Sequence, residues 1–188
     1  MKIGIDIDDT VTETLDEIKR LLALHEHEYA PEGEHIVPNH LIKNEFSQRF
    51  FADYAYEMLH DLKLKPHVKE VLLKLHEEGH ELLFITARSN TYLGDSYTFT
   101  KDYLERKEVY YDKLFAGEEH KLERCLAEGV DLMIDDSVRT CNRVQEGGVK
   151  SLVFNSEFNM NDETTCDRVD NWDQIYDYVH KETMGLSK

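Results

Sequence analysis

The chain has 188 residues, of which 39 are acidic and 22 are basic, and its formal net charge is −17. A chain of this length can bury a core of its own, so we expect one domain with room for a small insertion. So acidic a protein is a poor partner for nucleic-acid polymers and for anionic membrane surfaces. It also has no apolar run long enough to span a bilayer.

Three cysteines, Cys125, Cys141 and Cys166, are odd in number and lack the spacing of a metal site. Free thiols in a reducing compartment fit this pattern, so we expect no disulfide and no zinc site. No secretory signal precedes the first apolar segment. We therefore expect a cytoplasmic protein. The sequence leaves the oligomeric state open, a homodimer included.

The first expected element is a buried strand that ends in acids. A short apolar run over residues 2–7 breaks at Asp6, Asp8 and Asp9. Asp6 and Asp8 point to the same side of an extended chain, so their charges repel unless a cation lies between them. The hard cation Mg²⁺ prefers such oxygen ligands. Taken alone, the pattern fits a strand that runs into an acidic loop equally well.

Residues 12–64 are expected to form a helical insertion. Apolar residues recur at helical spacing after Thr10, residues 29–40 resemble a loop, and residues 41–62 are helical again. The second helical region is rich in aromatic side chains, namely Phe46, Phe50, Phe51, Tyr54 and Tyr56. Such a stripe is usually a packing surface. An insertion at this point of the chain would nevertheless lie over the strand ends, where open α/β sheets bind ligands.

From residue 65 onward, helices and strands alternate. Further strands are expected over residues 81–85, 110–115, 130–134 and 151–154, and helices from Pro66, over 96–107, and around 121–126, 138–147 and 172–176. This alternation predicts a parallel sheet of about five strands with right-handed crossovers. The expected class is therefore α/β, with a core of residues 1–11 and 65–188 and a small helical cap of residues 12–64.

Three of the expected strands end in groups that suit phosphoryl transfer. The groups are Asp6 with Asp8, then Thr86, then Asp135 with Asp136, and Lys121 precedes the last pair. A carboxylate can attack phosphorus to give an acyl phosphate, and magnesium held by acids neutralises phosphoryl oxygens. A lysine and a hydroxyl stabilise the developing charge. A response-regulator receiver uses similar groups, but there the acceptor aspartate lies on a middle strand and the lysine comes last.

These motifs resemble those of the haloacid dehalogenase superfamily of aspartate-nucleophile phosphatases. The segment Asp6-Ile7-Asp8-Asp9-Thr10 matches the first motif, Thr86 the second, Lys121 the third and Asp135-Asp136 the fourth. Within the superfamily, the chain is similar to the cytosolic type C 5′(3′)-deoxyribonucleotidases and their bacterial relatives. That similarity lies in the early insertion and in the segments Ile85-Thr86-Ala87-Arg88, Met133-Ile134-Asp135-Asp136-Ser137 and Asn171-Trp172. It implies a Rossmann-like sheet with a small helical cap.

The resemblance also implies a role for each matched residue. Asp6 would be the nucleophile and a metal ligand. Asp8 would protonate the leaving oxygen, later activate water, and touch the metal through its backbone carbonyl. Asp135 and Asp136 would anchor Mg²⁺, one directly and one through water, in an order that the sequence leaves open.

The phosphate contacts and the turn after the first strand are less settled by the sequence. Thr86 and the adjoining Ala87 would hold the phosphoryl group. Lys121 has the usual position of the third motif, while Lys101, which opens a helix after Thr86, is a competing phosphate contact. Asp9 stands where relatives commonly have glycine.

The expected function is that of a magnesium-dependent phosphomonoesterase. We expect a 5′(3′)-nucleotidase that acts on (deoxy)ribonucleoside monophosphates through an aspartyl-phosphate intermediate. One or two of Phe46, Phe50 and Phe51 would stack on the base, and the remaining rings would pack the insertion. Two alternatives stay open: a phosphatase for sugar phosphates or other small phosphomonoesters, and a non-catalytic phosphate-binding module. Against the second alternative, every expected catalytic position is filled.

Overall fold

Six parallel strands form one sheet in the computed structural model, which describes residues 1–30, 32–36 and 45–185. The strands are β1 (Lys2–Ile5), β2 (Glu81–Thr86), β3 (Lys113–Ala116), β4 (Leu132–Asp135), β5 (Lys150–Phe154) and β6 (Asp167–Val169). Their order in the sheet is β3-β2-β1-β4-β5-β6. The first strand is therefore central, with β2 on one side and β4 on the other. The expected α/β class with a parallel sheet is confirmed.

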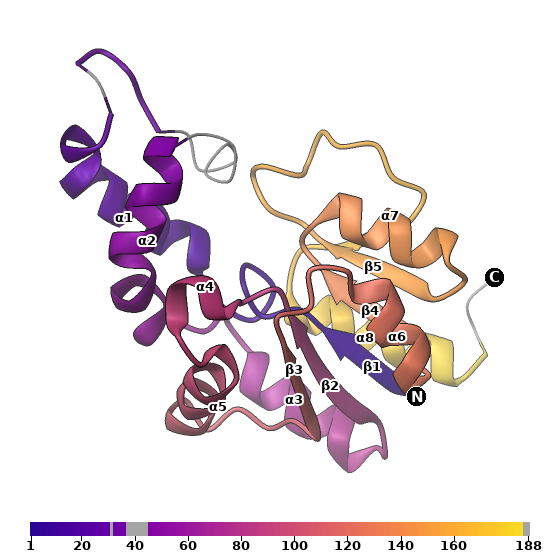
Figure 1. Ribbon diagram of the computed structural model, residues 1–188. Helices are drawn as coiled ribbons and strands as arrows, with labels where there is room; N and C mark the ends of the chain where they lie inside the picture. Colours follow the sequence, from indigo (N-terminus) through magenta and orange to yellow (C-terminus); the bar gives the residue numbers. More distant parts are fainter. Residues whose placement is uncertain (31, 37–44, 186–188) are drawn as a thin grey trace.

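Helices cover both faces of the sheet, as Figure 1 shows. The helices of the described residues are α1 (Thr14–His25), the short 3-10 helix η1 (Glu26–Glu28), α2 (Glu45–His60), α3 (Val68–Glu77), α4 (Asn90–Leu93), α5 (Ser96–Arg106), α6 (Lys121–Glu128), α7 (Val138–Glu146) and α8 (Trp172–Thr183), and α3, α6, α7 and α8 are the ones that cover the sheet. Successive side chains of a strand point to opposite faces. Ile134 accordingly lies in the core beneath α3 and α8, whereas Met133 packs with Cys125 of α6.

Among the residues that the structure describes, no helix is both long and apolar enough to cross a membrane.

Most of the predicted elements are found, and the differences occur at short or terminal segments. The predicted sheet lacked β6, which has only three residues and lies at the edge beside β5. So short a strand shows no periodicity in the sequence. The helix expected from Pro66 begins at Val68, because His67 before it has a left-handed backbone with φ of 63°. The short helix α4 was also missed, and residues 37–44 of the expected loop and second helical region lie outside the described residues.

The helical insertion is joined to the sheet by two connections that run side by side. Thr12 and Leu64 form an antiparallel bridge, Glu13 N donates to Lys63 O, and Lys65 N donates to Val11 O, both at 2.9 Å. In Figure 1, α1 and α2 lie apart from the sheet on the far side of these connections. On this basis we propose that residues 12–64 form a cap on a core of residues 1–11 and 65–188.

A tryptophan near the end of the chain holds the loop that follows β1. Trp172 is almost fully buried, and its indole N–H donates to Thr10 O at 2.9 Å across 162 positions of sequence. Thr10 itself is buried. The bond therefore fixes α8 against the turn that carries the first acidic motif.

Trp172→Phe is expected to lower the free energy of unfolding by about 1–3 kcal/mol, because it leaves the buried carbonyl of Thr10 without its donor. Tyr176→Phe is a matched control on the same helix, since its hydroxyl bonds to Glu78 at the surface; a change within about 0.5 kcal/mol is expected. Urea denaturation of both variants makes the comparison. Equal losses would show that the indole bond does not anchor this loop.

Candidate active site

Side chains from the ends of three neighbouring strands meet at one edge of the sheet. Asp6 directly follows β1, Thr86 closes β2 and Asp135 closes β4. The amide of Asp6 donates to Ile134 O at 2.9 Å, which extends the pairing of β1 with β4 as far as the acids. Because parallel strands end at a common edge, the three motifs that are distant in sequence become neighbours.

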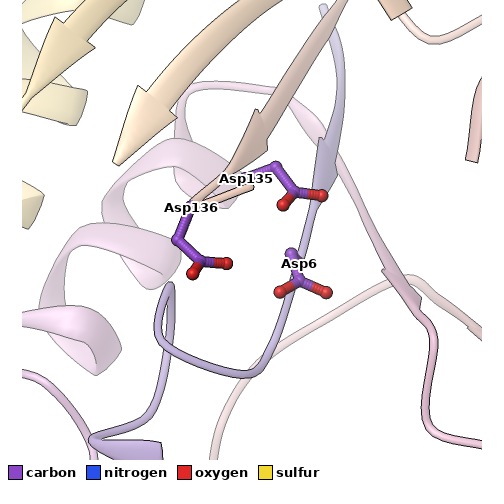
Figure 2. A group of neighbouring side chains, drawn as sticks. All are labelled: Asp6, Asp135 and Asp136. Carbon is purple, nitrogen blue, oxygen red and sulfur yellow. The ribbon is translucent and has the colours of Figure 1, made fainter. Parts of the chain in front are cut away.

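Asp6, Asp135 and Asp136 form a compact carboxylate cluster, and Figure 2 shows the three side chains converging from adjacent segments. One carboxylate oxygen from each lies within 4.8 Å of the others. Burial raises the pKa of Asp6 to about 7, with Lys121 opposing the shift and Asp135 adding to it. Burial, followed by the charges of Asp135 and Asp6, raises the pKa of Asp136 well above its usual range. The cluster therefore carries more negative charge than its protein surroundings stabilise.

A buried lysine lies between two of these acids. Lys121, the first residue of α6, donates from Nζ to Asp6 Oδ1 at 2.5 Å and to Asp135 Oδ2 at 2.7 Å. Burial disfavours its charge, but the two carboxylates outweigh that effect and raise the pKa of Lys121 above its usual value. Lys101 instead pairs with Glu105 at 2.9 Å on α5, with its side chain well exposed. Of the two lysines that the sequence offered, Lys121 lies beside the acids and Lys101 does not contact them.

The donor set fits a hard divalent cation. Mg²⁺ prefers carboxylate oxygens, and three such groups converge here. A bound cation would also relieve the repulsion that raises the pKa of Asp6 and Asp136. The carboxylate of Asp8, which the motif also suggested as a ligand, lies outside this cluster. A metal contact through its backbone carbonyl stays a prediction.

The Asp8 side chain is held by two groups that the sequence reasoning did not connect with it. Arg88 donates from Nε to Asp8 Oδ2 at 2.9 Å and from Nη2 to Oδ1 at 2.8 Å, and Thr14 Oγ1 donates to Oδ1 at 2.8 Å. Burial favours the neutral acid, but Arg88 outweighs it and lowers the pKa of Asp8 below its usual value. Arg88 stands two residues after the second motif, which was the one available signal.

Asp9 occupies a position with a left-handed backbone, its φ being 57°. Glycine adopts this conformation without strain, whereas a residue with a side chain does so at some cost. The aspartate is compensated by a hydrogen bond, since its Oδ1 accepts from Leu15 N at 2.8 Å in the first turn of α1. Burial raises the pKa of Asp9 to about 6, and the bond to Leu15 opposes the shift. Asp9 thus links the motif to the first cap helix.

The aromatic residues of α2 differ in their surroundings. Phe50 is fully buried and packs on Tyr29 and Tyr54 inside the insertion. Phe51 is only partly buried, and its ring meets that of Tyr92 on α4 edge-on at 5.0 Å. Phe46 is also partly buried. Of the three phenylalanines singled out in the sequence, Phe51 is therefore the one shown to face the segment that follows the second motif.

Comparison with known proteins gives a family match over nearly the whole chain. Residues 1–183 match the family model described as "5′ nucleotidase, deoxy (pyrimidine), cytosolic type C protein". A nucleotidase of Clostridium acetobutylicum is 28% identical over 186 residues, covering 96% of this chain and 94% of that protein. These matches confirm the resemblance drawn from the motifs.

Solved structures with low sequence identity share the fold. A haloacid dehalogenase-like hydrolase from Xanthomonas campestris superposes with a TM-score of 0.70 at 15% identity, covering 99% of this chain and 97% of its own. A haloacid dehalogenase-like family hydrolase from Streptococcus pneumoniae gives 0.67 at 13% identity, with 95% and 97% covered. The expected Rossmann-like arrangement is confirmed.

The carboxylate cluster predicts that Asp136→Asn stabilises the metal-free protein. A neutral amide of similar shape removes one charge, so the free energy of unfolding at about pH 8 should rise by roughly 1 kcal/mol or more. Because the pKa of Asp136 is raised, the native protein binds more protons than the unfolded chain at mildly acidic pH. Wild-type stability is therefore lost as pH rises, and its deficit relative to the variant should shrink between about pH 8 and pH 5.

Saturating Mg²⁺ should reverse the order, because a ligand of the native state stabilises the protein that binds it more tightly. Urea denaturation with and without the metal measures both effects. Asp102→Asn, which removes an exposed acid from α5, should change stability by less than about 0.5 kcal/mol. If Asp136→Asn lowers the stability of the metal-free protein at about pH 8, the cluster is not a site of charge repulsion.

Proposed function

Because the chain belongs to the family of cytosolic type C 5′-nucleotidases, which are phosphoric monoester hydrolases, we propose that it is a magnesium-dependent 5′(3′)-nucleotidase. Its substrates would be (deoxy)ribonucleoside monophosphates, hydrolysed through an aspartyl-phosphate intermediate. The observation that carries the proposal is the convergence of Asp6, Asp135 and Asp136, with Lys121 bound to two of these acids. The ring contact between Phe51 of α2 and Tyr92 of α4 supports a nucleotide as the substrate.

Asp6 is the nucleophile in this mechanism. It lies at the end of the central strand, and Lys121 donates to one of its oxygens, which stabilises the ionised form that can attack phosphorus. In the first step a bond forms between a carboxylate oxygen and phosphorus while the ester P–O bond breaks. When bound to the acid cluster, Mg²⁺ would neutralise phosphoryl oxygens and favour the ionised form of Asp6.

Asp8 exchanges protons with the leaving oxygen and with water. In the second step its carboxylate takes a proton from the water that attacks the aspartyl phosphate, and the lowered pKa of Asp8 favours this basic form. In the first step it must carry a proton to the leaving oxygen. Thr86, buried at the end of β2, and Lys121 would hold the phosphoryl oxygens, together with the backbone of Ala87.

The cap supplies the contacts that would favour a nucleotide over other phosphomonoesters. A base stacked on an aromatic side chain gains about 1–3 kcal/mol, largely regardless of its identity. Phe51 and Tyr92 come from α2 and α4, so a base bound there would be held between the insertion and the segment that follows Thr86. Phe46 is a further candidate from the same helix. Phe50 serves the interior of the insertion.

We also propose that the enzyme is cytoplasmic. Its three cysteines are buried free thiols, which fits a reducing compartment such as the cytoplasm. Its partner is a small phosphate monoester. A homodimer stays open.

The proposal predicts nucleotide preference in a panel of phosphate esters assayed with Mg²⁺ and with chelator. Nucleoside monophosphates should be hydrolysed with higher kcat/KM than sugar phosphates, and chelator should abolish turnover. Phe51→Leu should raise KM for nucleotides by about ten-fold or more while leaving a small aryl phosphate nearly unaffected.

Phe50→Leu is the matched control from the same helix. It should lower the melting temperature and reduce the rates on both substrates in parallel, because it leaves a cavity in the packed insertion. Should Phe51→Leu behave like Phe50→Leu, the aromatic pair is structural. A preference for sugar phosphates would contradict the nucleotidase proposal and favour the alternative of a phosphatase for sugar phosphates.

A further inference from the structure

Asp136 is the first residue beyond the paired part of β4. Asp135 closes that strand and pairs with Val153 of β5. One carboxylate oxygen of Asp136 lies within 4.8 Å of oxygens of Asp6 and Asp135, and Figure 2 shows the Asp136 side chain directed toward Asp6. Like charges at this distance repel each other. Repulsion therefore drives Asp136 out of the cluster unless the protein restrains it.

The restraint does not act on the Asp136 side chain itself. Lys121 donates to the carboxylates of Asp6 and Asp135, and no hydrogen bond reaches the carboxylate of Asp136 within the described part of the chain. The direction in which this carboxylate points is therefore set by its backbone.

A buried asparagine holds that backbone. Asn159 lies in the connection between β5 and β6 and is 5% exposed. Its Nδ2 donates to Asp136 O at 2.7 Å and to the carbonyl of Phe154, the last residue of β5, at 2.8 Å. The amide group thus bridges two neighbouring strand ends at the point where their own pairing stops.

The side-chain amide of Asn159 has only one orientation that suits this place. Its Oδ1 accepts from Ser156 N at 3.0 Å and from Arg168 Nη1 at 3.4 Å. An asparagine amide has two N–H donors and an oxygen that can accept two hydrogen bonds, so all four are used here. Turning the amide over would place its oxygen against the two carbonyl oxygens of Asp136 and Phe154. The donors are therefore fixed on Asp136.

Arg168 ties the segment that carries Asn159 to the sheet. Its Nη2 donates to Asn159 O at 3.1 Å and to Asp162 O at 2.8 Å, and its Nη1 donates to Asn155 Oδ1 at 2.7 Å. Arg168 belongs to β6, which pairs with β5. The support that Asn159 gives to Asp136 thus comes from the sheet itself.

We propose that Asn159 is a positioning residue of the metal site, which holds Asp136 against the repulsion of Asp6 and Asp135 so that its carboxylate is in place before a cation binds. Asn159 contacts the backbone carbonyl of Asp136 and leaves the carboxylate free for the metal. The proposal rests on the magnesium site of the proposed function. It does not depend on the preference for nucleotides.

A ligand that is already in place binds a metal more tightly than one that must first be moved there. The apparent affinity falls in proportion to the fraction of molecules in which the site is formed. Loss of a group that orients a metal ligand typically weakens metal binding by about 10–100-fold. Asn159 should therefore affect the affinity for Mg²⁺ in a protein that carries no substrate.

The test is Mg²⁺ binding to the whole protein without substrate, measured by isothermal titration calorimetry. Asn159→Ala removes the two hydrogen bonds from Nδ2 and should raise the dissociation constant for Mg²⁺ by about 10–100-fold. The rise in melting temperature that a fixed concentration of Mg²⁺ causes should shrink in the same variant, because a weaker ligand stabilises the native state less.

Asn155 supplies a matched control from the same connection. Its side chain bonds to Asp170 Oδ1 at 2.7 Å and to Arg168, and it makes no contact with Asp136. Asn155→Ala should lower the melting temperature of the metal-free protein but leave the dissociation constant for Mg²⁺ unchanged. A purely structural role for Asn159 predicts that both variants behave in this way.

Two outcomes overturn the proposal: a wild-type dissociation constant in Asn159→Ala, or an equal loss of affinity in Asn155→Ala. Asn159→Ser, whose hydroxyl can donate only one hydrogen bond, replaces the alanine variant if thermal melting shows the latter to be unfolded. It too should bind Mg²⁺ more weakly than the wild type, and an unchanged constant would again overturn the proposal.

The result is distinguishable from a failure of the proposed function. A preference for sugar phosphates in the ester panel would contradict the nucleotidase proposal but leave the effect of Asn159 on Mg²⁺ binding intact. A wild-type protein that binds no Mg²⁺ would overturn this inference together with the magnesium requirement.

Discussion

Repulsion among carboxylates at the ends of β1 and β4 is the constraint around which this protein is built. Asp6, Asp135 and Asp136 converge in a chain whose net charge is already −17. Lys121 offsets part of this repulsion by contacting Asp6 and Asp135 at once. A cation at the first residue of a helix is disfavoured by the helix dipole, so the two carboxylates must outweigh that effect as well as burial. The negative charge that remains is what a bound divalent cation would neutralise.

The segments that carry the reacting groups are each fixed by a bond from a distant part of the chain. Asn159, buried in the β5–β6 connection, donates to Asp136 O at 2.7 Å. Trp172 donates to Thr10 O, and Gly117 N donates to Arg88 O. Loops at a sheet edge are otherwise the most mobile part of such a fold. These bonds restrain the loops, so that the acids stay close together despite their repulsion.

The strand ends could be predicted from sequence because buried parallel strands appear as short apolar runs, and because such strands share one edge. That reasoning placed Asp6, Thr86 and Asp135 together, and the structure does the same. The partner of Asp8 could not be found this way, since its contact with Arg88 spans 80 positions and depends on how two loops pack. Spacing along the chain also could not separate Lys121 from Lys101. Likewise, helical periodicity marked an aromatic face on α2 without showing that Phe50 turns inward and Phe51 toward α4.

The central claim is that Asp6 becomes covalently phosphorylated during turnover. Acid quenching of the working enzyme, followed by proteolysis and mass spectrometry, tests it directly, because an acyl phosphate on Asp6 is trapped when hydrolysis stops. The account predicts a phosphorylated peptide that contains Asp6, that loses its phosphate to hydroxylamine and that is absent from Asp6→Asn. A phosphoryl group on any other residue, or turnover by Asp6→Asn at a substantial rate, would contradict it.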